Sequence, residues 1–199
     1  MEKLELYHLH KLGNHDKIWH ENAIIKVNEN FKNTMYERYQ NFTVGVPIDD
    51  GGKINLYDLI LLMQQRNLMP NMVNDIVDYS YQISFYASQF KRETALENYR
   101  LAKNYAYPSR LHSIYLTDEY GIESWRNKLG NDNLELFRVE AEGNIFKTSE
   151  FFIPIETLTY EESFNESYYY WNPNFKKVPK DANEYLVQGN IKVLEKIKI

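Results

Sequence analysis

The sequence of 199 residues contains no cysteine. Without a thiol the chain cannot form disulfide bonds, use a cysteine nucleophile, or hold zinc or an iron–sulfur cluster through cysteine. Glycine and proline are also few, at eight and six residues, which excludes the fibrous and low-complexity classes. With 43% hydrophobic and 26% charged residues, the composition is globular. The length predicts one domain, residues 1–199.

Long apolar segments are absent as well. The longest apolar run, residues 59–63, has five residues and is too short to cross a bilayer. The first five residues lack the apolar core of a secretory signal. These absences predict a soluble, cytoplasmic protein that does not bind membranes.

Several sequence signatures of enzymes are missing too. The turn at residues 50–53 lacks the glycine spacing of a P-loop or a dinucleotide-binding loop, and no serine-hydrolase elbow is present. The formal net charge of −5 argues against a general basic surface for nucleic acid. What the chain has in excess is tyrosine, at 17 residues, whose apolar ring and polar tip suit partly wet pockets.

The hydrophobic pattern changes period along the chain. Apolar residues alternating with polar ones predict strands at 4–9, 23–27, 111–116, 134–141 and 151–155. Helical spacing predicts helices at 56–63, behind an Asn55 N-cap, at 72–102 and at 118–128. Residues 156–182 are rich in tyrosine and lysine, and residues 183–199 resemble a strand pair that turns at residues 188–190. This order predicts an α+β fold with a helical region at about residues 53–106.

Three features of the chain have both an ordinary and a functional interpretation. The first histidines lie close together and can form part of a metal site, but no HExxH signature or partner carboxylate accompanies them, so we expect ordinary histidines and no metal. The apolar stripe of the long helix predicts core packing, with docking of a partner helix as the alternative. The lysine-containing segment 174–180, with aromatic residues at 168–171 just before it, predicts a solvated loop over a tyrosine-lined edge, with single-stranded nucleic acid as the alternative ligand. The histidines are His8, His10, His15 and His20, and the stripe is Met72, Ile76, Tyr79, Ile83, Tyr86 and Phe90.

Three short segments combine a strand pattern with one polar residue. They are Leu6-Tyr7-His8, Ser113-Ile114-Tyr115-Leu116-Thr117-Asp118 and Asn183-Glu184-Tyr185-Leu186-Val187. Their order and spacing resemble the three motifs of the ADP-ribosyltransferase superfamily, in the diphtheria-toxin and poly(ADP-ribose) polymerase branch with the H-Y-E triad. The chain also resembles an uncharacterised bacterial branch of that superfamily. The resemblance spans nearly the whole chain and implies split antiparallel β-sheets.

The resemblance implies a role for each matching residue. His8, Tyr115 and Glu184 match the catalytic triad, and Trp125 stands where a second aromatic residue belongs. Ser113 takes the position of the glycine that usually precedes the tyrosine. NAD is the implied co-substrate, bound by His8, Arg110, Ser113, Tyr115 and Trp125, without a metal.

The chemistry of such a site can also be argued from the residue types. Cleavage of the nicotinamide–ribose bond passes through an oxocarbenium-like sugar, which the carboxylate of Glu184 would stabilise. Aromatic faces attract the flat nicotinamide cation, and Tyr115 and Trp125 would enclose it. His8 would bond a ribose hydroxyl, Arg110 the pyrophosphate, and Ser113 the carboxamide, since it shares a strand face with Tyr115.

The function implied is a mono-ADP-ribosyltransferase that transfers ADP-ribose from NAD and releases nicotinamide. Its acceptor could be a protein, a nucleic acid or a small molecule, and the sequence does not indicate an oligomeric state. One alternative is a catalytically degraded domain of the same fold that binds a nucleotide or a partner protein. The other is an interaction module that docks a partner through its long helix.

Overall fold

The computed structural model describes residues 3–13, 16–41, 45–47, 52–66, 70–130 and 132–198. The chain forms two compact units. The first consists of Met1–Glu37 and Arg92–Ile199, and the second is Arg38–Lys91.

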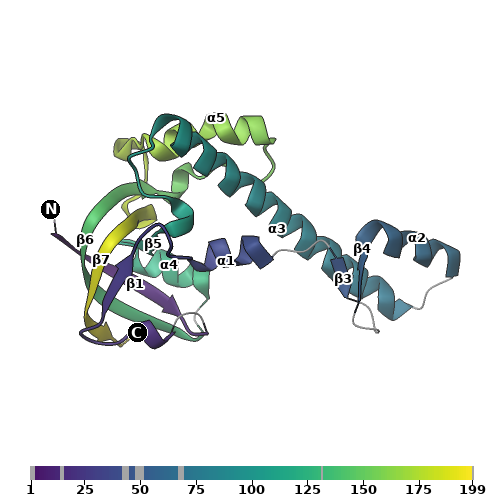
Figure 1. Ribbon diagram of the computed structural model, residues 1–199, viewed down its shortest axis with the longest axis horizontal. Helices are drawn as coiled ribbons and strands as arrows, with labels where there is room; N and C mark the ends of the chain where they lie inside the picture. The colour runs from purple at the N-terminus through teal and green to yellow at the C-terminus, as the bar shows by residue number, and fades with distance from the viewer. Residues whose placement is uncertain are drawn as a thin grey trace. The chain divides into compact units, whose positions relative to one another are not determined.

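The centre of the first unit is a curled antiparallel sheet (Figure 1). Its strands are β1 (Lys3–Lys11), β2 (Ile24–Val27), β5 (Ile114–Leu116), β6 (Leu134–Ser149) and β7 (Asn183–Ile197). They run in the order β1-β6-β7-β2, and β5 also pairs with β7. An antiparallel bridge between Tyr7 and Thr117 joins β1 to β5. The sheet therefore returns on itself and brings the three motif segments side by side, although they lie far apart in the sequence.

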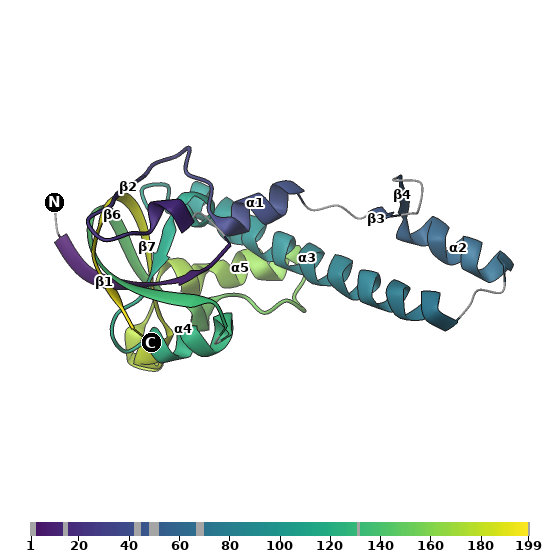
Figure 2. The ribbon, with the colours of Figure 1, turned by 90° about the horizontal axis from the view of Figure 1, so that it is seen from below.

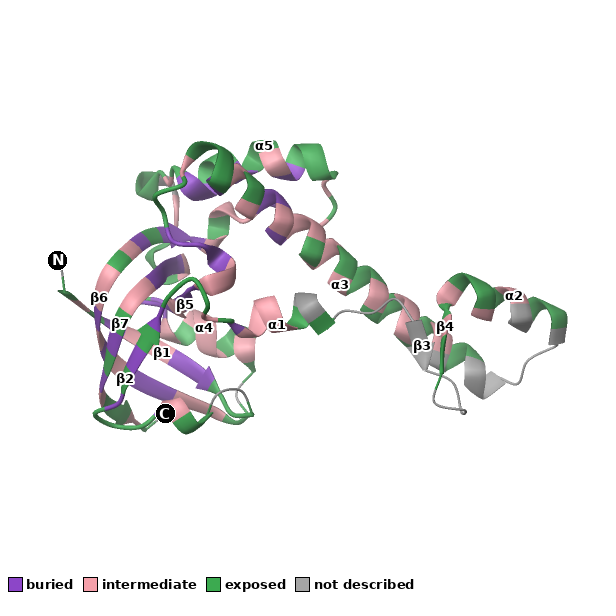
Figure 3. Cartoon of the chain, in the orientation of Figure 1, coloured by how far each residue is buried: buried purple, intermediate pink, exposed green. Residues whose placement is uncertain are grey.

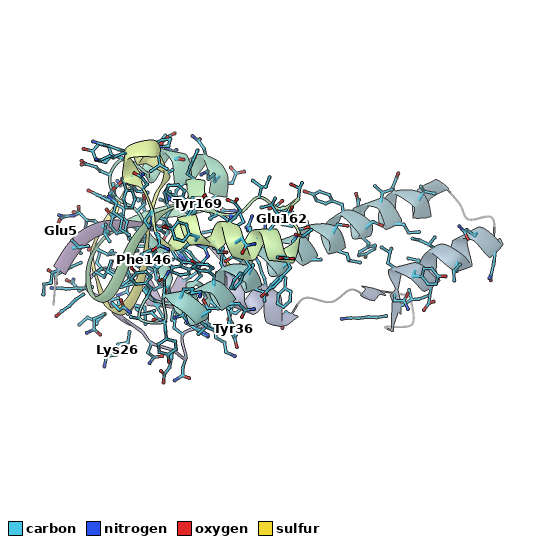
Figure 4. The ribbon with its side chains drawn as sticks, turned by 90° about the horizontal axis from the view of Figure 1, so that it is seen from above. Glu5, Lys26, Tyr36, Phe146, Glu162 and Tyr169 are labelled. Atoms are coloured by element: carbon cyan, nitrogen blue, oxygen red, sulfur yellow. The ribbon has the colours of Figure 1, made fainter. Side chains whose placement is uncertain are left out.

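The sheet buries apolar residues on both faces, as alternation along a strand requires. One face carries the larger cluster, which includes Leu6, Phe137 and Val187. The other face carries a smaller cluster of Leu96, Phe146, Tyr170, Trp171 and Leu186. Figure 3 shows buried residues on the strands and on the helices beside them. In Figure 4, Phe146 lies among densely packed side chains, whereas Glu5 and Lys26 lie at the periphery.

Helices cover the smaller cluster. The C-terminal end of α3 (Pro70–Lys103) lies alongside α5 (Tyr160–Trp171) in Figures 1 and 2. The indole N–H of Trp171 donates to the carbonyl oxygen of Leu96 at 2.9 Å and ties the two helices together. A capping box between Thr159 and Glu162 begins α5 and satisfies free N–H groups of its first turn. The first unit also contains α4 (Ile122–Leu129) and the start of α1 (Thr34–Asn41).

The sharpest close approach in the sheet lies between β6 and β7. Gly143 and Gly189 stand opposite each other, with φ of 142° and 157°. A Cβ atom on Gly189 would lie 2.1 Å from the carbonyl oxygen of Glu142. The two glycines let both strands continue past this point, so β7 is one strand of 15 residues. The predicted turn at residues 188–190 is wrong.

The second unit contains a two-stranded ribbon and helices. Its elements are β3 (Gly45–Pro47), β4 (Lys53–Asn55), α2 (Leu56–Arg66) and the N-terminal part of α3. The side chain of Asn55 accepts a hydrogen bond from the backbone N–H of Asp58 at 2.8 Å, which confirms the predicted N-cap. The turn expected at residues 50–53 begins outside the described residues.

Most elements predicted from periodicity are confirmed, including the two first strands, α2 and the long helix. The prediction of an α+β fold is correct. Two elements differ. Residues 110–112 form a 3₁₀ turn before β5, and Glu150–Phe152 forms another in place of the strand expected at 151–155. Helix α5 falls in a segment for which the sequence predicted no element. No helix in the described ranges has the length and apolar character that crossing a membrane requires.

Candidate functional site

The carboxylate of Glu184 lies at the N-terminal end of β7, inside the first unit. Tyr115 pairs directly with Leu186, two residues further along β7. Residues two apart on a strand share a face, so Glu184 and Tyr115 lie on the same face of the sheet. This is the face of the smaller cluster. Glu184 is 1% exposed, so its carboxylate depends on protein partners.

Arg110 supplies the positive charge for Glu184. One edge of its guanidinium donates to Glu93, through Nε to Oε2 at 2.6 Å and Nη2 to Oε1 at 3.2 Å. The remaining nitrogen, Nη1, donates to Oε1 of Glu184 at 2.8 Å and also bonds the hydroxyl of Tyr170. The same hydroxyl donates to Oε1 of Glu184. Arg110 thus bridges one carboxylate from α3 and one from β7.

Two aromatic rings flank this cation. The guanidinium carbon of Arg110 lies 5.2 Å from the ring centroid of Tyr115 and 4.7 Å from that of Tyr170. Both distances permit cation–π attraction. The group of Glu93, Arg110, Tyr170 and Glu184 is named the buried cluster here, since each residue is at most 2% exposed.

Burial and charge act together on the ionisation of this cluster. Burial alone lowers the pKa of Arg110, but Glu93, Tyr115, Tyr170 and Glu184 outweigh it and hold that pKa well above its ordinary value. Burial raises the pKa of the Tyr170 phenol well above its ordinary value. Arg110 therefore stays charged, and Tyr170 keeps the proton that it donates. A buried charge that loses its partner typically costs about 3–5 kcal/mol of stability.

The backbone beside Arg110 is fixed by three further side chains. The hydroxyl of Tyr115 donates to the carbonyl oxygen of Arg110 at 2.8 Å. The side-chain amide of Asn33 donates to the same carbonyl and to that of Ser113. The hydroxyl of Ser113 donates to the carbonyl oxygen of Ser109 at 2.6 Å. This network sets the direction in which Arg110 enters the cluster.

His8 contacts Tyr115 through the backbone only. Its Nδ1–H donates to the carbonyl oxygen of Tyr115 at 3.0 Å. His8 pairs with Phe137 of the larger cluster, and its ring stacks on Trp19 with centroids 3.9 Å apart. The imidazole of His8 thus lies on the face opposite to the Tyr115 ring. Burial lowers the pKa of His8 to about 3, so the imidazole is neutral at physiological pH.

Trp125 lies near the start of the strand that carries Glu184. Its indole N–H donates to the carbonyl oxygen of Asn183 at 3.4 Å. The ammonium of Lys128 lies over the Trp125 ring, 5.7 Å from the centroid. Partial burial lowers the pKa of Lys128, against the opposite effects of Asp181 and Glu184.

The structure brings together three of the six predicted site residues. Glu184, Arg110 and the ring of Tyr115 meet in or beside the buried cluster. Arg110 was expected to bind pyrophosphate, but it is 2% exposed and its donors are directed at protein groups. Ser113 is fully buried, and its hydroxyl has a backbone partner. His8 and Trp125 bond the backbone carbonyl oxygens of Tyr115 and Asn183 and do not contact the buried cluster through these bonds.

Sequence reasoning missed Glu93 and Tyr170. Glu93 lies in the continuation of the apolar stripe of α3. The available signal was a carboxylate at a position where the helical spacing predicts an apolar residue. Tyr170 was interpreted as part of a tyrosine-rich surface segment. Its neighbours Tyr168 and Tyr169 are half exposed, whereas Tyr170 and Trp171 are fully buried.

Among the histidines of the N-terminal segment, His8 and His10 lie close together, with ring centroids 5.9 Å apart, and both rings lie against Trp19. Nε2 of His10 lies 2.8 Å from Oδ1 of Asp16, and His20 is exposed with Nδ1 near the carbonyl oxygen of Glu21. His15 lies outside the described residues. Over the ranges that the structure describes, no group of three or more His, Asp or Glu residues is arranged to hold a metal ion.

Comparison with known proteins gives one family match. The model of the family described as "Protein of unknown function (DUF2441)" matches residues 6–199. No curated protein matches the chain.

Proposed function

We propose that this chain, which belongs to the DUF2441 family, is a mono-ADP-ribosyltransferase that takes ADP-ribose from NAD. The observation that carries the proposal is that Glu184, Tyr115 and Tyr170 together surround a flat cation. They hold the guanidinium of Arg110, which is a flat cation, against a carboxylate and two aromatic rings. The nicotinamide ring of NAD is also a flat cation, and the same groups attract it.

The strand arrangement supports the proposal as well. The motif strands β1, β5 and β7 lie side by side, joined by the Tyr7–Thr117 bridge and the β5–β7 ladder. Glu184 and the Tyr115 ring share one face. A carboxylate and an aromatic ring on one face are what cleavage of a cationic glycosidic bond needs.

The proposed reaction breaks the bond between ribose C1′ and the nicotinamide nitrogen. The bonding electrons leave with nicotinamide, which becomes neutral, and positive charge develops on the ribose ring. The Glu184 carboxylate stabilises this charge, since an oriented anion in a dry site interacts strongly with it. An acceptor nucleophile then bonds to C1′, and its proton passes to a base, for which Glu184 is the candidate.

A catalytically silent, nucleotide-binding domain is the second candidate. The observation that favours it is the position of His8, whose ring is stacked on Trp19 on the opposite face. In this case NAD binds without losing nicotinamide.

Assays of nicotinamide release and of NAD binding separate the two candidates. The purified full chain is incubated with NAD, free nicotinamide is measured, and NAD binding is followed by calorimetry. Release by the wild type that Glu184→Gln abolishes supports the transferase. Saturable binding without release supports the silent domain, and absence of both refutes the two candidates.

A further inference from the structure

The buried cluster contains one more acidic group than the proposed chemistry uses. Glu93 and Glu184 both bond the guanidinium of Arg110, and both carboxylates are 1% exposed. Glu93 Oε1 also lies 3.6 Å from Nη2 of Arg92. Glu93 receives two donors of Arg110, at 2.6 and 3.2 Å, and Glu184 receives one, at 2.8 Å. Paired donors on one carboxylate form the stronger and more directional arrangement. Glu93 is therefore the main counter-ion of Arg110.

We propose that Glu93 is a positioning residue, which holds Arg110 so that Glu184 can exchange this cation for the substrate cation. The proposal rests on the proposed function for the identity of that substrate. Arg110 and the nicotinamide ring compete for the same carboxylate and the same tyrosine faces. For NAD to enter, the Glu184 carboxylate must turn away from Nη1 while the guanidinium stays buried and charged. The paired contacts with Glu93 allow this, because they need only Nε and Nη2.

The position of Glu93 in the fold fits this task. It lies on α3, one turn before Leu96, whose carbonyl accepts the Trp171 indole. The helix is thereby tied to α5, which supplies Tyr170. Glu93 is thus held in place by a helix–helix contact that does not involve the Glu184 side chain. When Glu184 turns toward a ligand, the Glu93–Arg110 pair need not move with it.

Neutralising Glu93 tests the proposal. In Glu93→Gln, Arg110 has Glu184 as its remaining carboxylate in the buried cluster and competes harder with NAD. We expect kcat/KM for nicotinamide release to fall by about tenfold or more. Replacing Arg110 in the same chain, as Glu93→Gln with Arg110→Met, removes the competitor and restores most of kcat/KM. A purely structural role predicts that the double variant is as impaired as the single one, or more, and that result overturns the proposal.

Glu97→Gln is the matched control. Glu97 lies one turn further along α3 and forms an equally close pair with Arg100, at 2.7 Å, with both side chains largely buried. That pair does not include Glu184. Because the pair lies outside the buried cluster, its neutralisation should leave kcat/KM within about twofold of the wild type. An equal loss in both single variants would show that any buried acid on this helix matters, and would contradict a specific role for Glu93.

A second measurement distinguishes failure of this proposal from failure of the proposed function. If the wild type releases no nicotinamide, the transferase is refuted, and the sharing of Arg110 is tested by thermal unfolding. Glu184→Gln should lower the melting temperature more in the Glu93→Gln background than in the wild type, because Arg110 then loses its last carboxylate in the cluster. Equal shifts in the two backgrounds show that the acids do not share Arg110, and overturn the proposal independently of turnover.

Discussion

Replacing His8 by asparagine should remove a specific part of the acid sensitivity of the fold. The folded state lowers the pKa of His8 from its ordinary value of 6.5 to about 3, because burial penalises the charged imidazole. The unfolded chain therefore binds a proton below pH 6.5 that the folded chain refuses. Stability from this group is complete above pH 6.5 and is lost as pH falls toward 3. Asparagine does not titrate, yet it can still donate to the carbonyl oxygen of Tyr115.

The magnitude follows from the two pKa values. Each tenfold difference in proton affinity is worth about 1.4 kcal/mol, so lowering the pH from 7 to 5 costs the wild type at most about 2 kcal/mol through His8. Urea unfolding of wild type and His8→Asn at both pH values measures this difference directly. The exposed His20 provides the control, since His20→Asn should retain the wild-type pH dependence. Equal losses of stability in wild type and His8→Asn would refute the reasoning.

Three further substitutions, with Gly13→Ala as the control for the first, test the packing of the first unit, each by urea unfolding. Gly189→Ala should lower the free energy of unfolding by more than about 2 kcal/mol, because its Cβ atom would meet a backbone oxygen at 2.1 Å. Gly13→Ala should lower it by only about 1 kcal/mol, because Gly13 has a φ of 106° but open space around it. Trp171→Ala should cost about 3–5 kcal/mol by opening a cavity in the smaller cluster; a cost below 1 kcal/mol would contradict the described packing. Tyr170→Phe should cost about 1.5–3 kcal/mol because it removes a hydroxyl bonded to two charged groups, and an unchanged stability would show that this hydroxyl is not bonded.

Local patterns in the sequence were sufficient to predict the elements that have a regular spacing of apolar residues. The core packing predicted for the stripe of α3 is not confirmed, since Phe90 is 47% exposed. The spacing of apolar residues predicted α3 and the first strands, and Asn55 was predicted as an N-cap from its position alone. The error in β7 has a physical cause. A glycine between polar residues indicates a turn, and only the opposite strand reveals that Gly189 instead makes room for Gly143.

The candidate site could be predicted only in part, for a related reason. Glu184 and Tyr115 stand in the motifs from which the site was predicted, and Arg110 lies three residues before the second motif. Glu93 and Tyr170 reach the same cluster from helices whose placement depends on tertiary packing, 17 and 60 residues from Arg110 in the sequence. No periodicity within α3 or α5 signals such a pairing. The side of the sheet on which the His8 ring lies follows from strand register, which the sequence alone did not reveal.

In the proposed reaction the Glu184 carboxylate promotes cleavage of NAD. The most direct test is the rate of nicotinamide release from NAD by the wild type and by Glu184→Gln, each shown to be folded by its unfolding transition. We expect release by the wild type and a loss of about a hundredfold or more in the variant, as for removal of one oriented stabilising group. Release at the same rate by both proteins, or none by the wild type, would contradict the proposed reaction.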